Sequence, residues 1–391
     1  MSKRNKGINT ICTHVGEIED EQFKGAISPL YMSTSYAFED VDIKRYPRYF
    51  NTPNQMALSQ KIAALEHAEA AMIFSSGMAA ISTSLLAFLN AGDHIVLQRT
   101  LYGGTYNFVN EEFTKYGIEY SFTDGFEPQD FGAKIQKNTK AIFIETPSNP
   151  LLTITDLTAI GKIAKEHNLV SIIDNTFASP VNQNPIDFGI DIVIHSATKY
   201  MGGHSDICAG AVATTTKNME RIFSLAKNLG GNLSDYTVWL LERSIKTMGI
   251  RVKAQNENAQ HLAEYLARHK EIEHVYYPGL PNHPGHALAK SQMNGFGGMM
   301  SFELNANYDA SEFQKALKLI KSSMSLAGVE STVLSPTQTS HALLGAEERK
   351  KQGIADGLIR FSVGIEEPED LIADIEQALA FIRTISATTA H

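Results

Sequence analysis

The 391-residue chain has few of the features that mark extracellular, membrane or nucleic-acid-binding proteins. Its two cysteines, Cys12 and Cys208, stand far apart without a C-x-x-C motif, which argues against a disulfide framework and predicts a reducing cytoplasm. No apolar run approaches the ~18–20 residues that cross a bilayer. The N-terminal "MSKRNKGINT" lacks the apolar core of a secretory signal. The net charge of −9 comes without a basic cluster, so neither nucleic acid nor an anionic membrane is expected as a partner.

The chain is long enough for two domains, since single domains span roughly 100–200 residues. Residues 1–55 are irregular and rich in Pro, Tyr, Ser and Asn, which predicts an extended arm that packs on another surface. Residues 56–243 alternate strand-like and helical patterns, which predicts an α/β domain with a mostly parallel sheet covered on both faces. Residues 244–391 begin with a long helical pattern and predict a smaller α+β domain.

Apolar runs with the length of buried strands recur through the central region. They are "HIVLQ" (94–98), "IEYSFTD" (118–124), "AIFIET" (141–146), "LVSIIDN" (169–175), "DIVIHS" (191–196) and "GAVATT" (210–215). The preceding segment from Met56, "MALSQKIAALEHAEAAM", has a helical period instead. In the C-terminal region the strand candidates are "GGMMSFEL" (297–304) and "LIRFSVGIE" (358–366).

Polar side chains follow three of these runs. Asn149 comes shortly after "IFIET", and Asp174 ends "LVSIID". Ser196, Thr198 and Lys199 follow "IDIVIH". Because ligands of such sheets bind at the carboxyl ends of the strands, we expect these side chains to converge on one crevice.

A lysine beside a buried aspartate is typical of a pyridoxal phosphate (PLP) site. The Lys199 amine can form a Schiff base with the PLP aldehyde, and Asp174 can pair with the protonated pyridine nitrogen. That pairing keeps the ring cationic, so the ring can accept electrons released when a bond to the substrate's α-carbon breaks. The residues therefore predict PLP as the cofactor.

The phosphate of PLP needs an anion site, and the sequence offers one. Ser76, Gly77 and Met78 stand immediately before a helical pattern in "FSSGMAAISTSLLAFL". Free N–H groups at a helix start bind anions, and the glycine permits close approach. Ser196 and Thr198 are expected to add hydroxyl donors.

Each of these residues also has a plain structural interpretation. Lys199 can be a solvated side chain, Asp174 a helix cap or turn former, and Arg360 one half of a structural ion pair. "SSGMAA" can be only a helix cap. The order of these residues, each at a strand end or helix start, favours the PLP interpretation.

Histidines raise the alternative of a metal site. His195 and His204 stand near Asp206, and His283 is followed by His286. Neither group has zinc-like spacing, so no metal is predicted. The glycines of "GFGGMM" (295–300) do not form the G-x-G-x-x-G of a nucleotide site.

"HSATKYMGGHSD" closely resembles the PLP-lysine segment of the Cys/Met-metabolism (trans-sulfuration) PLP-dependent enzymes. Further motifs in that family's order cover nearly the whole chain: "FSSGMAAI", "LYGGTY", "IETPSNPLL", "IIDNTF", "NHPGHALAKSQ", "GFGGMMSFEL" and "GLIRFSVGIE". The resemblance implies PLP-dependent transferase fold type I, which is aspartate-aminotransferase-like, with a mostly parallel α/β domain and a smaller α+β C-terminal domain. It also implies a homotetramer built from close dimers.

The resemblance implies roles around the cofactor. Lys199 would be the Schiff-base lysine and Asp174 the partner of the pyridine nitrogen. Tyr102 would stack on the ring and act as a general acid/base. The residues that would surround the phosphate are Ser76, Gly77, Met78, Ser196 and Thr198.

The resemblance also implies roles for residues that contact the substrate or the neighbouring subunit. Asn149 and Ser325 would orient the substrate, and Arg360 would hold its α-carboxylate with a bidentate fork. Tyr46 and Arg48 would reach the phosphate in the neighbouring subunit, so that a monomer would have an incomplete site.

Several positions depart from the family's usual pattern. The arm reads "YPRYFNTP", with Pro47 in place of a serine. Gly104 stands where methionine γ-lyases typically carry a cysteine. Met324 stands where many cystathionine γ-lyases and γ-synthases carry a glutamate. "SPTQTSHA" (335–342) differs from the more usual "HPASMTHA".

We expect a carbon–sulfur lyase of sulfur amino-acid metabolism that cleaves L-cystathionine by γ- or β-elimination. Methionine γ-lyase, cystathionine γ-synthase and O-acylhomoserine sulfhydrylase activities stay open, because the members of the family share the residues named above. A catalytically silent PLP-binding scaffold is the alternative from another class. The intact Lys199, Asp174 and Arg360 argue against it.

Overall fold

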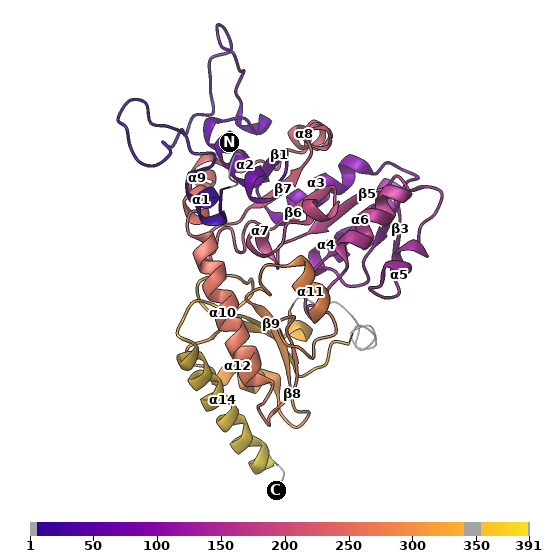
Figure 1. Ribbon diagram of the computed structural model, residues 1–391, viewed down its shortest axis with the longest axis vertical. Coiled ribbons are helices and arrows are strands. Elements are labelled where there is room, and N and C mark those ends of the chain that lie inside the picture. Colours follow the sequence, from indigo (N-terminus) through magenta and orange to yellow (C-terminus); the bar gives the residue numbers. More distant parts are fainter. Residues whose placement is uncertain (1–5, 340–352, 390–391) are drawn as a thin grey trace.

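Two β-sheets with their covering helices form the body of the protein, and the N-terminal arm extends from one end (Figure 1). The computed structural model describes residues 6–339 and 353–389. The last part of "SPTQTSHA", from residue 340 on, lies outside these residues. No helix in the described ranges is long and apolar enough to cross a membrane.

The larger sheet has seven strands in the order β1-β7-β6-β5-β4-β2-β3. In chain order they are β1 (Ala70–Phe74), β2 (His94–Leu97), β3 (Glu119–Phe122), β4 (Thr139–Glu145), β5 (Val170–Asp174), β6 (Ile192–His195) and β7 (Gly210–Thr214). Strands β3, β2, β4, β5 and β6 pair in parallel, whereas β7 is antiparallel to both β6 and β1. The mostly parallel sheet and the strands predicted between residues 94 and 215 are confirmed.

The helix predicted from Met56 to Met72 is wrong in its last part, where the chain forms strand β1. Helix α2 (Pro53–Leu65) ends early, and His67 then adopts a left-handed φ of 57°. From Ala70 to Phe74 the chain pairs with β7 along its whole length. The alanines of this segment favour a helix locally, but pairing at the sheet edge overrides that preference.

Helices cover both faces of the larger sheet because its strands are apolar on both sides. Phe143 of β4 belongs to the apolar cluster beneath α3 (Gly77–Phe88), α4 (Gly103–Glu112) and α8 (Thr216–Leu229). Ile142 and Ile144 belong to the cluster beneath α5 (Pro128–Gly132) and α6 (Leu157–Glu166). This alternation follows from the two-residue period of a strand.

The smaller sheet has the order β10-β11-β12-β9-β8. Its strands are β8 (Ile272–Tyr276), β9 (Met299–Leu304), β10 (Lys321–Ser322), β11 (Thr332–Leu334) and β12 (Leu358–Ser362). The predicted strands at 297–304 and 358–366 correspond to β9 and β12. The apolar side of this sheet shares one cluster with α10 (Met248–Leu266), α12 (Ala310–Ala316) and α14 (Pro368–Thr389).

The remaining helices lie in the arm and in the connections. They are α1 (Ile8–His14), η1 (Pro47–Tyr49), η2 (Phe113–Tyr116), α7 (Ser179–Asn182), η3 (Pro185–Phe188), α9 (Asp235–Ile245), α11 (His286–Gln292) and η4 (Pro336–Gln338). Helix α1 contacts α2 and α10, although no helix is predicted in that part of the arm. The predicted domain boundaries after residues 55 and 243 stay predictions.

We expect Phe143→Ala to lower the free energy of unfolding by about 3–5 kcal/mol, because it removes a fully buried ring from the centre of the larger sheet. Urea unfolding followed by circular dichroism measures the change. The matched control is Phe381→Ala, whose ring is 49% exposed and should matter little. Equal effects from the two variants would contradict this account of the core.

Candidate active site

A cavity of about 400 Å³ lies at the carboxyl ends of β4, β5 and β6, and Arg360 of the smaller sheet lines it as well. Most of the site residues predicted from the sequence line this cavity. They are Ser76, Gly77, Met78, Tyr102, Asn149, Asp174, Ser196, Thr198, Lys199, Ser325 and Arg360. The structure therefore brings together side chains from widely separated parts of the chain.

Lys199 lies in the tight turn that follows β6. Its Nζ donates a hydrogen bond to Ser325 Oγ at 2.6 Å. Burial lowers the pKa of Lys199 to about 8, and the Arg360 guanidinium acts in the same direction, whereas Cys208 and Asp174 oppose it. About a tenth of the amine is then unprotonated at pH 7, far more than for an ordinary lysine, and a nucleophile or a base requires this neutral form.

Asp174 ends β5 and is buried. Its Oδ1 accepts hydrogen bonds from the Thr176 backbone N–H, at 3.0 Å, and from the Thr176 hydroxyl. Thr176 Oγ1 in turn accepts from the Ser196 N–H at 2.8 Å, which ties the end of β5 to the turn after β6. Burial raises the pKa of Asp174, and the hydrogen bonds from Thr176 act against that rise.

Glu145 also lines the cavity, although it is not among the site residues predicted from the sequence. It ends β4 and stands opposite Asp174 in the register of β4 and β5. Its carboxylate accepts the N–H of Tyr102 at 2.7 Å and the N–H of Asn149 at 2.9 Å. Burial and the adjacent Asp174 carboxylate raise the pKa of Glu145 to about 8. Its signal in the sequence, an acid that ends an apolar strand, is the same as that of Asp174.

The side chain of Arg360, on β12 of the smaller sheet, reaches a residue that follows β4 of the larger sheet. Its Nη1 donates to Asn149 Oδ1 at 3.2 Å, and its Nη2 donates to the Ser325 carbonyl at 3.0 Å. Ser325 has a left-handed φ of 78°, a conformation that a non-glycine residue holds only with support from its surroundings. Burial lowers the pKa of Arg360 to about 10, so the side chain remains a cation near neutral pH. A guanidinium in this position can bind a carboxylate in the cavity.

The first turn of α3 forms one end of the cavity. Ser76 caps the helix, since its Oγ accepts from the Ala79 N–H at 3.0 Å. Gly77 lies so close to Ser196 that an added Cβ would stand 2.8 Å from the Ser196 Cβ. The glycine therefore lets the start of α3 pack directly against Ser196, so that the helix-start N–H groups and the Ser196 hydroxyl lie side by side at this end of the cavity, as an anion site requires.

Tyr46 and Arg48 do not line the cavity. The Arg48 guanidinium donates to the Lys227 carbonyl. It also lies 5.6 Å from the ring centre of Tyr46 and 5.4 Å from that of Tyr49. In a single chain these two predicted phosphate ligands are therefore separate from the rest of the site.

The histidines considered as metal ligands have other partners. His195 Nε2 contacts Glu66 Oε1, and His286 Nδ1 bonds to the Pro278 carbonyl at 2.7 Å. Across residues 6–339 and 353–389, no group of three or more His, Cys, Asp or Glu side chains is placed to hold a metal ion.

The chain matches one family model over almost its full length. The model describes Cys/Met metabolism PLP-dependent enzymes and matches residues 9–380. The chain belongs to this family. It is thus a PLP-dependent enzyme, PLP is its cofactor, and the family and cofactor predicted from the sequence are confirmed.

Relatives with cystathionine in their names match the chain from end to end. It is 45% identical over 374 residues to cystathionine gamma-lyase of Bacillus subtilis (strain 168), covering 95% of this chain and 98% of the relative. It is 44% identical over 368 residues to cystathionine beta-lyase of Lactococcus lactis subsp. cremoris (strain MG1363), covering 93% of this chain and 97% of the relative.

A solved structure of a cystathionine lyase has the same fold as this chain. The crystal structure of cystathionine gamma-lyase from Lactobacillus plantarum complexed with L-serine superposes with a TM-score of 0.93 at 40% identity. The match covers 97% of this chain and 100% of that one. The predicted PLP-dependent transferase fold type I is confirmed.

We expect the Lys199 amine of the cofactor-free protein to lose its proton with a midpoint near pH 8, because burial lowers its pKa. Competitive acetylation read by mass spectrometry measures this midpoint. Arg360→Met should raise the midpoint by removing a repelling cation, and Asp174→Asn should lower it by removing an attracting anion. A midpoint near the ordinary lysine value of about 10.4 would contradict this description of the site.

Proposed function

We propose that the enzyme is a carbon–sulfur lyase that cleaves L-cystathionine by γ- or β-elimination. The observation that carries the proposal is the grouping of an amine of lowered pKa, a buried carboxylate and a buried guanidinium in one cavity. These groups belong to Lys199, Asp174 and Arg360. The names of the two relatives above support cystathionine as the substrate.

The cavity fits PLP at three places. Lys199 offers an amine for the aldehyde, and Asp174 offers a carboxylate for the pyridine nitrogen. The start of α3, where Gly77 packs against Ser196, offers N–H groups for the phosphate, with hydroxyls from Ser196 and Thr198 beside it. Ser76 and Met78 complete the phosphate end, and the ring of Tyr102, which lines the cavity, lies over the cofactor. Bound PLP supplies an electron-accepting ring that stabilises negative charge on the substrate's α-carbon.

Side chains of the cavity bind the substrate and transfer its protons. Arg360 and Asn149 hold the substrate's α-carboxylate, with Ser325 beside them. Lys199 Nζ removes the α-proton. In β-elimination the electron pair of the Cβ–S bond leaves with sulfur, and the thiolate takes up a proton. In γ-elimination Lys199 and Tyr102 must first move a proton from Cβ, after which the Cγ–S bond breaks.

Gly104 favours cystathionine over methionine as the substrate. A Cβ on this residue would stand 2.5 Å from a ring carbon of Tyr102 and 3.0 Å from the sulfur of Met78. A cysteine, which methionine γ-lyases typically carry there, would displace the Tyr102 ring from this position. Methionine γ-lyase, cystathionine γ-synthase and O-acylhomoserine sulfhydrylase remain the alternatives to test.

We expect the PLP-loaded enzyme to release a 2-oxo acid, ammonia and a thiol from L-cystathionine. Pyruvate with homocysteine identifies β-elimination, and 2-oxobutyrate with cysteine identifies γ-elimination. Chromatography of both products separates the two reactions. Lys199→Ala should show no turnover. If no product forms from cystathionine, the proposal is wrong, and methionine or O-acylhomoserine with sulfide becomes the next substrate to test.

We infer further that the enzyme is a homotetramer of close dimers, in which the arm completes the neighbouring subunit's site. Large apolar side chains of the arm are exposed in the single chain, among them Phe23, Ile27, Leu30, Tyr31, Met32, Phe38, Val41 and Ile43. Figure 1 shows the loops of the N-terminal arm extending beyond the two sheets and their helices. Such exposure favours a partner surface, and Arg48, which has no place in its own cavity, is available for the neighbour's phosphate.

This assembly predicts that two inactive variants restore each other. Arg48→Ala and Lys199→Ala chains should each have little or no activity alone. Co-expressed in equal amounts, they should give about a quarter of the wild-type activity, because half of the dimers are hybrids with one intact site. Purification of hybrids with two affinity tags makes the measurement direct. An inactive hybrid would mean that Arg48 serves its own chain.

A further inference from the structure

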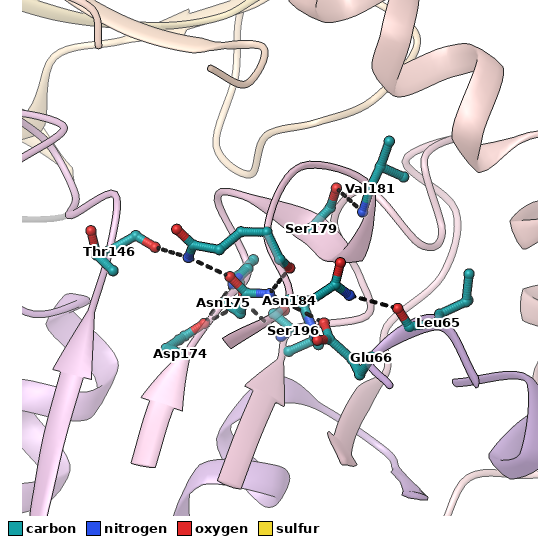
Figure 2. Close-up of polar contacts among 12 residues, drawn as sticks. Leu65, Glu66, Thr146, Asp174, Asn175, Ser179, Val181, Asn184 and Ser196 are labelled. Carbon is teal, nitrogen blue, oxygen red and sulfur yellow. Dashed lines mark hydrogen bonds and ion pairs between the residues drawn. The ribbon is translucent and has the colours of Figure 1, made fainter. Parts of the chain in front are cut away.

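A buried cluster of polar side chains lies beneath Asp174, away from the cavity. Figure 2 shows Asp174, Asn175 and Glu66 gathered at the ends of neighbouring strands. Glu66 follows α2 and is 0% exposed, and His195, at the end of β6, is 2% exposed. The two side chains are in contact through Glu66 Oε1 and His195 Nε2. Neither belongs to the set of residues that line the cavity.

Asn175 connects this pair to the residue next to it in the chain, Asp174. Its Nδ2 donates to Glu66 Oε1 at 3.2 Å and to the Gln183 carbonyl at 2.9 Å. Gln183 Nε2 donates back to Asn175 Oδ1 at 2.9 Å and to the Thr146 carbonyl at 3.0 Å. These bonds fix which end of the Asn175 amide faces Glu66, so Glu66 Oε1 must act as an acceptor there.

His195 reaches Asp174 by a second route. The N–H of the next residue, Ser196, donates to Thr176 Oγ1, and the Thr176 hydroxyl donates to Asp174. Two routes of hydrogen bonds and peptide bonds thus link the Glu66–His195 pair to Asp174. One runs through Asn175, and the other runs through Ser196 and Thr176.

The charges around Asp174 give the pair an electrostatic role as well. Glu145 on β4 is the neighbouring acid, and Lys199 and Arg360 are the cations on the cavity side. His195 is the charged partner on the protein side, and its positive charge lowers the pKa of Asp174. Among the described residues no donor reaches Glu66 Oε2, so the contacts that satisfy this buried carboxylate are those of Oε1 with His195 and Asn175.

We propose that Glu66 and His195 are positioning residues, which hold the Asp174 carboxylate ionised and aimed at the pyridine nitrogen of PLP. Glu66 Oε1 holds the His195 ring in place, and His195 lowers the pKa of Asp174, which favours the charged form of that carboxyl. The inference rests on the proposed role of Asp174. A purely structural pair would anchor α2 to β6 without any effect on the cofactor nitrogen.

The test uses the full-length enzyme loaded with PLP labelled with ¹⁵N in the ring, because the nitrogen chemical shift reports its protonation directly. The variants are Glu66→Gln, His195→Gln and the double variant, which leaves no unpaired charge and replaces the single variants where these fail to fold. Asp174→Asn is the reference for loss of the carboxylate. His269→Gln is the matched control, since it breaks a partly buried histidine–carboxylate pair, His269 with Glu271 at 3.1 Å, in the C-terminal region.

We expect the pair variants to lower the apparent pKa of the ring nitrogen by about one unit and to weaken PLP binding about tenfold. We also expect kcat to fall about tenfold with KM for the substrate nearly unchanged, and the His269→Gln control to change none of these quantities. A wild-type nitrogen titration in the folded pair variants would overturn the inference, as would an equal change in the control. If Asp174→Asn itself leaves the nitrogen unchanged, the proposed role of Asp174 is wrong, and that result is distinct from failure of the pair alone.

Discussion

The site depends on two carboxylates that the larger sheet buries side by side. Glu145 and Asp174 end adjacent parallel strands and stand opposite each other in register. Two like charges this close in a buried place are costly, and burial together with Asp174 raises the pKa of Glu145 to about 8, so that Glu145 is mostly protonated near neutral pH. Backbone N–H groups bond to the Glu145 carboxyl, and the Thr176 hydroxyl bonds to Asp174. The positions of Tyr102, Asn149 and Arg360 follow from this requirement, because each of them contacts or faces one of the acids.

The two sheets contribute different parts of this arrangement. The larger sheet fixes Asp174 at the end of β5 and carries Lys199 in the turn after the neighbouring strand β6. The smaller sheet brings Arg360, whose Nη1 bonds to Asn149 after β4 of the larger sheet and whose Nη2 bonds to the Ser325 carbonyl between β10 and β11 of its own sheet. The guanidinium that we propose for the substrate carboxylate is therefore attached to a different layer from the groups that we propose to hold the cofactor.

Much of this site could be predicted from the sequence because its residues follow apolar strands, and a strand end is a visible signal. Glu145 has the same signal, but its importance depends on accepting two backbone N–H groups, which no local pattern reveals. The contact of Glu66 with His195 joins residues 129 positions apart, and only the folded sheet brings them together. At strand β1 a local pattern is instead misleading, since its alanine-rich sequence favours a helix and pairing with β7 overrides that preference.

The same reasoning explains why the family is clear from the sequence and the bond that is cleaved is not. Cofactor chemistry is determined by groups on rigid strand ends, and all of these are intact in the chain. The described positions at which the chain departs from the family's usual pattern, in contrast, lie outside the strands. Met324, at the cavity wall, is 74% exposed, and Gly104 leaves room for the Tyr102 ring. Small changes at such positions can redirect the reaction while the carboxylates, the lysine and the arginine stay in place.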